Sequence, residues 1–233
     1  TFVAVPTPQL ETGECNTAIL EDVMQQLNKS KGLLVIVKST VPSYKLQSIQ
    51  EQCVDLRIVY NPEFLTEKNY INDFVNPPMH VFGGDKTHCH YLYQFYLDHS
   101  RCKDTTTRSY YLTPAEASFV KYGINSFLAS KVLWFNQFSD LCEKHNVKYN
   151  AVMNSMITDQ RIGNSHITVP GPDGRKGYGG ACFPKDTNAF SRFAEGDFSL
   201  LDLVIKENNK YRSEYKLDDR EKEQNVVYIR NKI

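Results

Sequence analysis

The stretch Leu33-Leu34-Val35-Ile36-Val37-Lys38-Ser39-Thr40-Val41-Pro42 decides the fold class of this chain. Its first five residues are apolar without alternation, which is typical of a strand that is covered on both faces. Polar residues and a proline follow, and a helical pattern over 43–53 comes next. A buried strand that ends in a polar loop and leads into a helix is the repeating unit of a parallel α/β sheet.

The same unit recurs on both sides of this stretch. Further strands are predicted at 1–5, 57–60, 79–82 and 109–112, with helices near 17–30 and 87–99. Strands that alternate with helices predict a partial doubly wound, Rossmann-like parallel sheet. Ligands of such sheets bind beyond the carboxyl ends of the strands, which here directs attention to the loops 6–8, 39–42 and 61–67.

A long central helix is predicted from Pro114 to about residue 145, followed by an all-helical part. Thr113-Pro114-Ala115-Glu116 has the form of a capping box with proline at the first helical position, which gives Glu116 a structural role. Helical patterns resume near 149–158, 186–195 and 199–215, and the charge run 218–223 is interpreted as a solvated turn or helix face. We therefore expect a Rossmann-like domain over 1–112, a central helix with a helical dimerisation or substrate domain over 113–215, and a linker or the start of another domain over 216–233.

Composition excludes several classes of function. The 233 residues carry 27 basic and 27 acidic side chains, so no overall charge attracts nucleic acid or a membrane surface. No apolar run approaches the ~18 residues of a membrane helix. The six cysteines are scattered without a Cys-x-x-Cys pair, and His88-Cys89-His90 matches no common zinc spacing, so we expect reduced thiols, a cytoplasmic location and no metal. Because a strand pattern starts at Thr1, we also expect a fragment of a longer protein.

The loop Gly177-Tyr178-Gly179-Gly180-Ala181-Cys182-Phe183-Pro184-Lys185-Asp186 carries the chemistry. Glycines let the backbone approach a bulky ligand, and Pro184 suits the first turn of a helix. Cys182 then lies beside a positive helix end and near the ammonium of Lys185, and both favour a thiolate. The pattern predicts a nucleophilic cysteine, and the alternative is a buried cysteine at a helix start.

Six motifs in this order resemble the UDP-glucose/GDP-mannose dehydrogenase family over nearly the whole chain. They are Val5-Pro6-Thr7-Pro8, Lys38-Ser39-Thr40-Val41-Pro42, Asn61-Pro62-Glu63-Phe64-Leu65 with Glu67, Lys121 with Asn125, Arg161-Ile162-Gly163, and the loop from Gly177 to Asp186. The resemblance implies an enzyme that uses two NAD⁺ to oxidise the C6 alcohol of a nucleotide sugar to a carboxylate, UDP-glucose to UDP-glucuronate. Cys182 would form a thiohemiacetal and then a thioester.

The resemblance also implies roles for single residues. Catalytic roles fall on Cys182, Lys121, Asn125, Asp186, Glu67 and Thr40. Because Lys121 and Asn125 are four positions apart, they share one helix face and could stabilise an oxyanion, although surface positions would explain the same pair. Asp186, Glu67 and Thr40 would orient the hydrolytic water or its neighbours. Substrate contacts are implied for Glu63, Phe64, Leu65, Arg161, Gly177, Tyr178 and Gly179, and cofactor contacts for Pro6, Thr7, Thr40, Glu67 and Lys185.

The resemblance implies a UDP-sugar substrate, NAD as cofactor, and a homodimer through the central helix, in which Arg161 can reach the neighbouring subunit. The apolar residues Phe127, Leu128, Trp134, Phe135 and Phe138 suit such an interface, but packing within one subunit explains them equally well.

The chain also departs from the family. It has no Gly-x-Gly-x-x-Gly fingerprint, Ser118 stands where the family often has glutamate, and Pro170–Gly174 lengthens the loop. We therefore expect the isolated chain to be inactive. The alternatives are a GDP-mannose or UDP-N-acetylhexosamine dehydrogenase, a two-electron β-hydroxyacid dehydrogenase, and a non-catalytic remnant that acts as a binding domain.

Overall fold

The computed structural model describes residues 1–66, 68–102 and 108–229. The chain divides into two compact units. The first consists of Thr1–Pro8 and Cys15–Gly123, and the second of Gln9–Glu14 and Ile124–Ile233. The helix α5 (Pro114–Lys144) begins in the first unit and ends in the second.

Within its described residues, the first unit is built on a five-stranded sheet in the order β1-β2-β3-β4-β5. The strands are β1 (Phe2–Val3), β2 (Leu34–Val37), β3 (Arg57–Tyr60), β4 (Met79–Gly84) and β5 (Arg108–Leu112), so each predicted strand is present. The pairs β1–β2, β2–β3 and β4–β5 are parallel.

The predicted parallel sheet has one exception, since β3 and β4 are antiparallel, with Val59 opposite Gly84. A parallel return needs a crossover, usually a helix that packs on the sheet. The described part of the connection between these strands contains one helix, α3 (Tyr70–Val75), and none of its residues is buried. Since α3 buries no residue, it does not provide the packed crossover that a parallel return would need, and the chain turns back beside β3.

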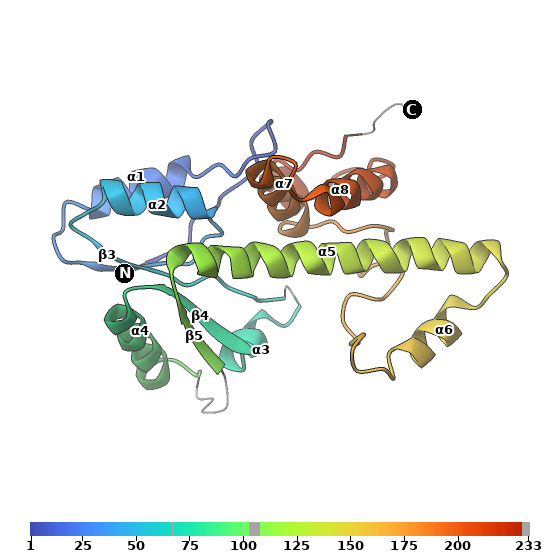
Figure 1. Ribbon diagram of the computed structural model, residues 1–233, viewed down its shortest axis with the longest axis horizontal. Coiled ribbons are helices and arrows are strands. Elements are labelled where there is room, and N and C mark those ends of the chain that lie inside the picture. The colour runs from blue at the N-terminus through green and yellow to red at the C-terminus, as the bar shows by residue number, and fades with distance from the viewer. Residues whose placement is uncertain (67, 103–107, 230–233) are drawn as a thin grey trace. The chain divides into compact units, whose positions relative to one another are not determined.

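Helices cover both faces of this sheet, as a doubly wound fold requires (Figure 1). On one face, α1 (Ala18–Leu27) and α2 (Ser43–Gln52) pack against Val35 and Val37. On the other face, α4 (Lys86–His99) packs against Ile36, the residue between them. Alternate residues of one strand therefore serve two different cores, which explains why the stretch 33–37 is apolar throughout.

The capping box at the start of α5 is confirmed. The backbone N–H of Glu116 donates to Thr113 Oγ1 at 3.2 Å, and the N–H of Thr113 donates to Glu116 Oε2 at 2.7 Å. These reciprocal bonds satisfy backbone donors that have no partner inside the helix. Ala117, the residue after Glu116, is fully buried and packs into the core of the first unit. The start of α5 is thereby fixed to the sheet.

The second unit is helical, with α6 (Tyr149–Met156), α7 (Phe183–Ala194), α8 (Ser199–Arg212) and α9 (Asp219–Glu223) after the end of α5. A small core joins Ala129 and Leu133 of α5 to Tyr178 and Val204. The interpretation of 218–223 as a solvated segment is wrong for Glu221, whose side chain is 0% exposed. None of the described helices is long and apolar enough to cross a membrane.

Candidate active site

In the first unit, the loop after β3 lies against α5. Lys121 Nζ donates to the carbonyl oxygen of Glu63 at 2.6 Å and lies 3.2 Å from Glu63 Oε1. The same ammonium lies 5.4 Å from the ring centroid of Phe64. The backbone N–H of Leu65 donates to the other carboxylate oxygen, Glu63 Oε2, at 2.7 Å. Two residues predicted for the site, Glu63 and Phe64, therefore contact this buried ammonium, and Leu65 contacts it through Glu63.

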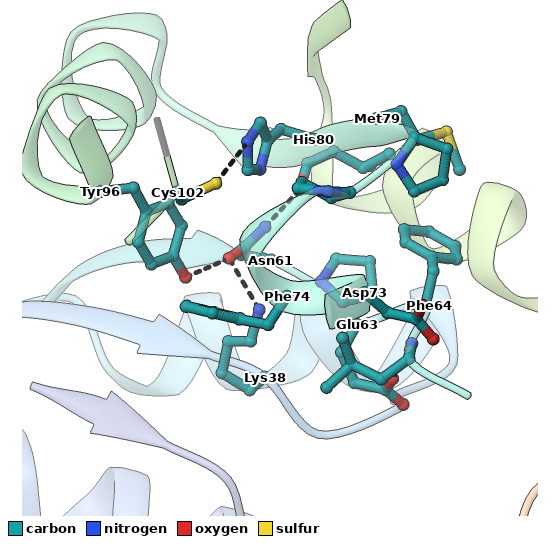
Figure 2. A pocket seen from close by; sticks show the side chains of 15 residues that line it. Lys38, Asn61, Glu63, Phe64, Asp73, Phe74, Met79, His80, Tyr96 and Cys102 are labelled. Atoms are coloured by element: carbon teal, nitrogen blue, oxygen red, sulfur yellow. Dashed lines mark hydrogen bonds between the residues drawn. The ribbon is translucent and has the colours of Figure 1, made fainter. Parts of the chain in front are cut away.

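A small cavity of about 40 Å³ adjoins this cluster (Figure 2). On its wall, Asn61 Oδ1 accepts hydrogen bonds from Lys38 Nζ at 2.9 Å and from Tyr96 Oη at 2.7 Å. Asn61 Nδ2 donates to the carbonyl of Val81 at 2.8 Å. Burial lowers the pKa of Lys38 to about 8, although the charge of Glu63 raises it. A polar cavity of this size has room for ordered water.

Neither Lys38 nor Asn61 nor Tyr96 was assigned a role from the sequence. The sequence holds one indication for Lys38, because a charged residue at the end of an apolar strand is a candidate for a binding site. It holds none for Tyr96, because its partner Asn61 is 35 positions away in the chain.

In the second unit, a buried cluster joins α5 to the first turn of α7. Asn125 Nδ2 donates to Asp186 Oδ2 at 2.6 Å, and Lys185 Nζ donates to Asp186 Oδ1 at 2.5 Å. The side chain of Asp186 is 1% exposed. Each carboxylate oxygen therefore has a strong donor, which fixes the orientation of the carboxylate and of the amide.

Cys182 is exposed and occupies the N-cap position of α7, while Pro184 lies in the first turn as predicted. The N–H of Asp186 donates to the carbonyl of Cys182 at 2.9 Å and opens the helix. The other five cysteines are buried. The alternative of a buried structural cysteine is therefore excluded for Cys182. An exposed sulfur at a positive helix end is accessible to an electrophile.

The glycine-rich loop before Cys182 is anchored by side-chain amides. The N–H of Gly177 donates to Asn136 Oδ1 at 3.0 Å. Asn208 accepts from the N–H of Tyr178 at 2.7 Å and donates to its carbonyl at 3.0 Å. The side chain of Tyr178 is buried in the small core of the second unit. Contacts of this loop with a ligand would therefore come from its backbone.

Arg161 is displayed on the surface of the second unit. Its side chain is 89% exposed and forms an ion pair with Asp159, with Nη2 and Oδ2 2.5 Å apart. Lys131 Nζ on α5 donates to the carbonyl of Ile162 at 2.9 Å and holds this turn in place. The guanidinium is therefore accessible from solvent.

The cofactor residues expected in the first unit lie in the loops after β1 and β2. Thr7 Oγ1 donates to the carbonyl of Thr40 at 3.0 Å, and Ser39 Oγ donates to the carbonyl of Val5 at 2.7 Å. Pro6 between them is exposed. Glu67, expected to contact both water and cofactor, lies outside the described residues.

A sheet wound on both faces, followed by a long helix and a helical unit that presents an exposed cysteine, defines a class of two-part α/β oxidoreductases. Two family comparisons place the chain within that class. Residues 1–97 match the NAD binding domain of the UDP-glucose/GDP-mannose dehydrogenase family, and residues 115–210 match its central domain. The chain belongs to this family.

Relatives from two bacteria are named UDP-glucose 6-dehydrogenase. UDP-glucose 6-dehydrogenase of Rickettsia bellii is 30% identical over 219 residues, which cover 90% of this chain and 49% of that protein. UDP-glucose 6-dehydrogenase YwqF of Bacillus subtilis is 34% identical over 221 residues, covering 89% and 48%. The structure of a UDP-glucose dehydrogenase from Pyrobaculum islandicum superposes with a TM-score of 0.78 at 30% identity and covers 90% of this chain and 50% of that one. The chain thus spans about half the length of the relatives it matches.

The cofactor of the matched NAD binding domain is NAD, and the residues present fit part of it. The joined loops after β1 and β2 lie at the carboxyl ends of parallel strands, where such ligands bind. The sequence has no Gly-x-Gly-x-x-Gly turn to receive the pyrophosphate. These loops would therefore form one wall of an NAD site, with contacts from Pro6, Thr7 and Thr40.

Proposed function

We propose that this chain contributes the catalytic residues for the NAD-dependent, four-electron oxidation of the C6 alcohol of a nucleotide sugar, UDP-glucose to UDP-glucuronate. The observation that carries the proposal is the exposed Cys182 at the start of α7, beside the buried cluster of Asn125, Asp186 and Lys185. The names of the relatives support UDP-glucose as the substrate. Residues Glu63, Phe64, Leu65, Arg161 and the backbone of Gly177, Tyr178 and Gly179 are proposed to contact it.

The C6 alcohol is first oxidised to an aldehyde, with loss of two electrons and two protons. The sulfur of Cys182 then adds to the aldehyde carbon, and the new S–C bond makes a thiohemiacetal whose former carbonyl oxygen carries negative charge. Its oxidation gives a thioester. Water then attacks the ester carbon, the C–S bond breaks, and the carboxylate leaves while the sulfur returns as a thiolate. When bound, NAD accepts the electrons in both oxidation steps.

Lys121 and Asn125 are proposed to stabilise the charged oxygen. They are four positions apart on α5, so they lie one helical turn from each other on the same face. An ammonium and an amide N–H that are held in place before the reaction are effective because they need no reorganisation when charge develops. Asp186 orients the amide of Asn125, and Lys185 orients Asp186. Thr40 and Glu67 are proposed to position the hydrolytic water.

The proposed partner is a second copy of the chain, bound through α5. Phe127, Trp134 and Leu141 follow one another at seven-residue spacing and are 69%, 50% and 51% exposed, whereas Phe135 is 3% exposed. The helix thus separates a stripe that faces outward from residues that serve its own core. Light scattering tests this: Trp134→Glu should convert a dimer to a monomer, and a monomeric wild type would refute the proposal. We also propose a cytoplasmic location.

The stoichiometry of NADH tests the reaction. The full chain that contains this sequence should release two NADH per UDP-glucose and form UDP-glucuronate, whereas a two-electron dehydrogenase would release one. Cys182→Ser should abolish acid formation, because a serine hydroxyl is a far weaker nucleophile than a thiolate. Cys53→Ala, at a cysteine buried in the other unit, is the control and should keep two NADH per sugar. Normal acid formation by Cys182→Ser would refute the mechanism.

A further inference from the structure

A buried ion pair lies beneath the glycine-rich loop that leads to Cys182. Arg212 Nη2 on α8 lies 2.7 Å from Glu221 Oε1 on α9, and the two side chains are 1% and 0% exposed. The other end of the guanidinium, Nη1, donates to Asp173 Oδ2 at 2.7 Å. Asp173 belongs to the same long loop as the glycines. The pair thus connects this loop to α8 and α9.

Glu221 collects donors from several segments. Its Oε1 accepts from the N–H of Gly180 at 3.2 Å and from Tyr228 Oη at 2.8 Å, in addition to the arginine. Its Oε2 accepts from the N–H of Asp218 at 2.9 Å. An ionised carboxylate is an acceptor at both oxygens, so it suits a place where only donors converge. The consequence is that a backbone N–H two residues before Cys182 is held by a side chain 41 positions further along.

The loop passes so close to the ion pair that only glycine fits at position 179. A Cβ atom there would lie 2.0 Å from Arg212 Nη2 and 2.6 Å from Glu221 Oε1. The next residue, Gly180, has φ +80°, in the left-handed region that glycine adopts without strain. The two glycines therefore allow the buried charges to bind the backbone directly.

We propose that Arg212 and Glu221 are positioning residues for Cys182: they fix the backbone of Gly179 and Gly180, so that the sulfur begins α7 exposed and at the positive end of the helix. This inference rests on the proposed function for the catalytic role of Cys182. A buried ion pair is weak evidence for stability, because an apolar pair of similar volume often stabilises a protein equally well. Neither apolar side chain could accept the N–H of Gly180, and this bond explains why charges are placed here.

The reactivity of the sulfur tests the proposal without substrate or cofactor. The full chain is treated with iodoacetamide under native conditions, and alkylation of Cys182 is followed by mass spectrometry. Hydrogen exchange of peptide 177–182 is followed in parallel. Glu221→Gln keeps the volume but directs an NH₂ group at converging donors. We expect at least tenfold faster exchange of the peptide, and at least fivefold slower alkylation because the sulfur leaves the positive helix end.

Glu223→Gln makes the same chemical change at an exposed position of the same helix and should leave both rates at the wild-type values. Unchanged exchange in Glu221→Gln, or alkylation as fast as in the wild type, would overturn the proposal.

A double variant separates positioning from stability. Arg212→Met combined with Glu221→Leu should be more stable than Glu221→Leu alone, since it leaves no buried charge of the pair, although the donors that converge on position 221 still lack their acceptor. Exchange of peptide 177–182 should stay fast and alkylation slow, because Gly180 still lacks its acceptor. A stable double variant with wild-type rates would show that the pair has a structural role only. Since these measurements need no turnover, an inactive enzyme would refute the proposed function and leave this result intact.

Discussion

Asn125 and Asp186 join two helices through one short hydrogen bond, with Nδ2 on α5 and Oδ2 in the first turn of α7 separated by 2.6 Å. An amide has two N–H bonds, so Asn125 can serve the carboxylate with one and an oxyanion with the other. The bond also fixes which way the amide points. The amide of Asn125 and the helix that begins at Phe183 are therefore held to each other inside the second unit.

Removing the charge of Asp186 should destabilise the protein strongly. Asp186→Asn removes a buried carboxylate charge that accepts from both Asn125 and Lys185, and breaking a buried ion pair costs about 3 kcal/mol. Urea unfolding measures the loss. Asp197→Asn, at an exposed aspartate just after α7, is the matched control and should change little. Equal unfolding free energies for the two variants would contradict the importance of the cluster.

Lys121→Met tests transition-state stabilisation. If the ammonium acts on the developing oxyanion, kcat of the full enzyme should fall ~100-fold with a nearly unchanged KM. Lys144→Met, at an exposed lysine in the last turn of the same helix, should leave both constants unchanged. A rise in KM alone would mean that Lys121 contributes equal binding to substrate and transition state.

Local patterns in the sequence predicted the strands and α5 well. Val35, Ile36 and Val37 are apolar because two cores meet at one strand, and the capping box is formed by residues three positions apart. The burial of Glu221 could not be predicted, because its partner Arg212 lies in another helix and the run 218–223 resembles a solvated surface. The antiparallel β3–β4 pair could not be predicted either. The direction of a strand depends on whether the connecting segment packs across the sheet, and this packing is a long-range contact.

The candidate site also contains residues that local patterns predict and contacts that they do not. Cys182 was predicted from the glycines and proline of its motif, and Asp186 from the resemblance of that motif to the family. The hydrogen bonds of Asn61 to Lys38 and Tyr96 join β2, β3 and α4, so they arise only when the sheet is assembled. Sequence patterns report on neighbours along the chain, so they could not predict these two bonds, whose partners are 23 and 35 positions apart.

The pH dependence of stability tests the environment of Lys38. Burial lowers its pKa to about 8 in the folded protein, against about 10.4 for an unperturbed lysine. Between these values the unfolded state binds more protons than the folded state, so stability should rise with pH. Relative to Lys38→Met, the wild type should gain up to about 3 kcal/mol between pH 8 and 10.4, measured by urea unfolding.

Lys29→Met, at an exposed lysine of the same unit, should keep the pH dependence of the wild type. A constant difference between the wild type and Lys38→Met across this range would show that Lys38 keeps its proton in both states.

The same substitution at two glycines should act in opposite directions. Gly123 lies inside α5, and a Cβ atom there would meet nothing within 4 Å. Gly123→Ala should therefore stabilise the protein by about 0.5–1 kcal/mol, because alanine loses less backbone freedom on folding. Gly179→Ala should destabilise it by about 3 kcal/mol, since the methyl group would displace the guanidinium of Arg212 from a buried pair. Urea unfolding measures the free energy of unfolding of both variants. A Gly179→Ala variant as stable as the wild type would mean that the loop passes the ion pair at a greater distance.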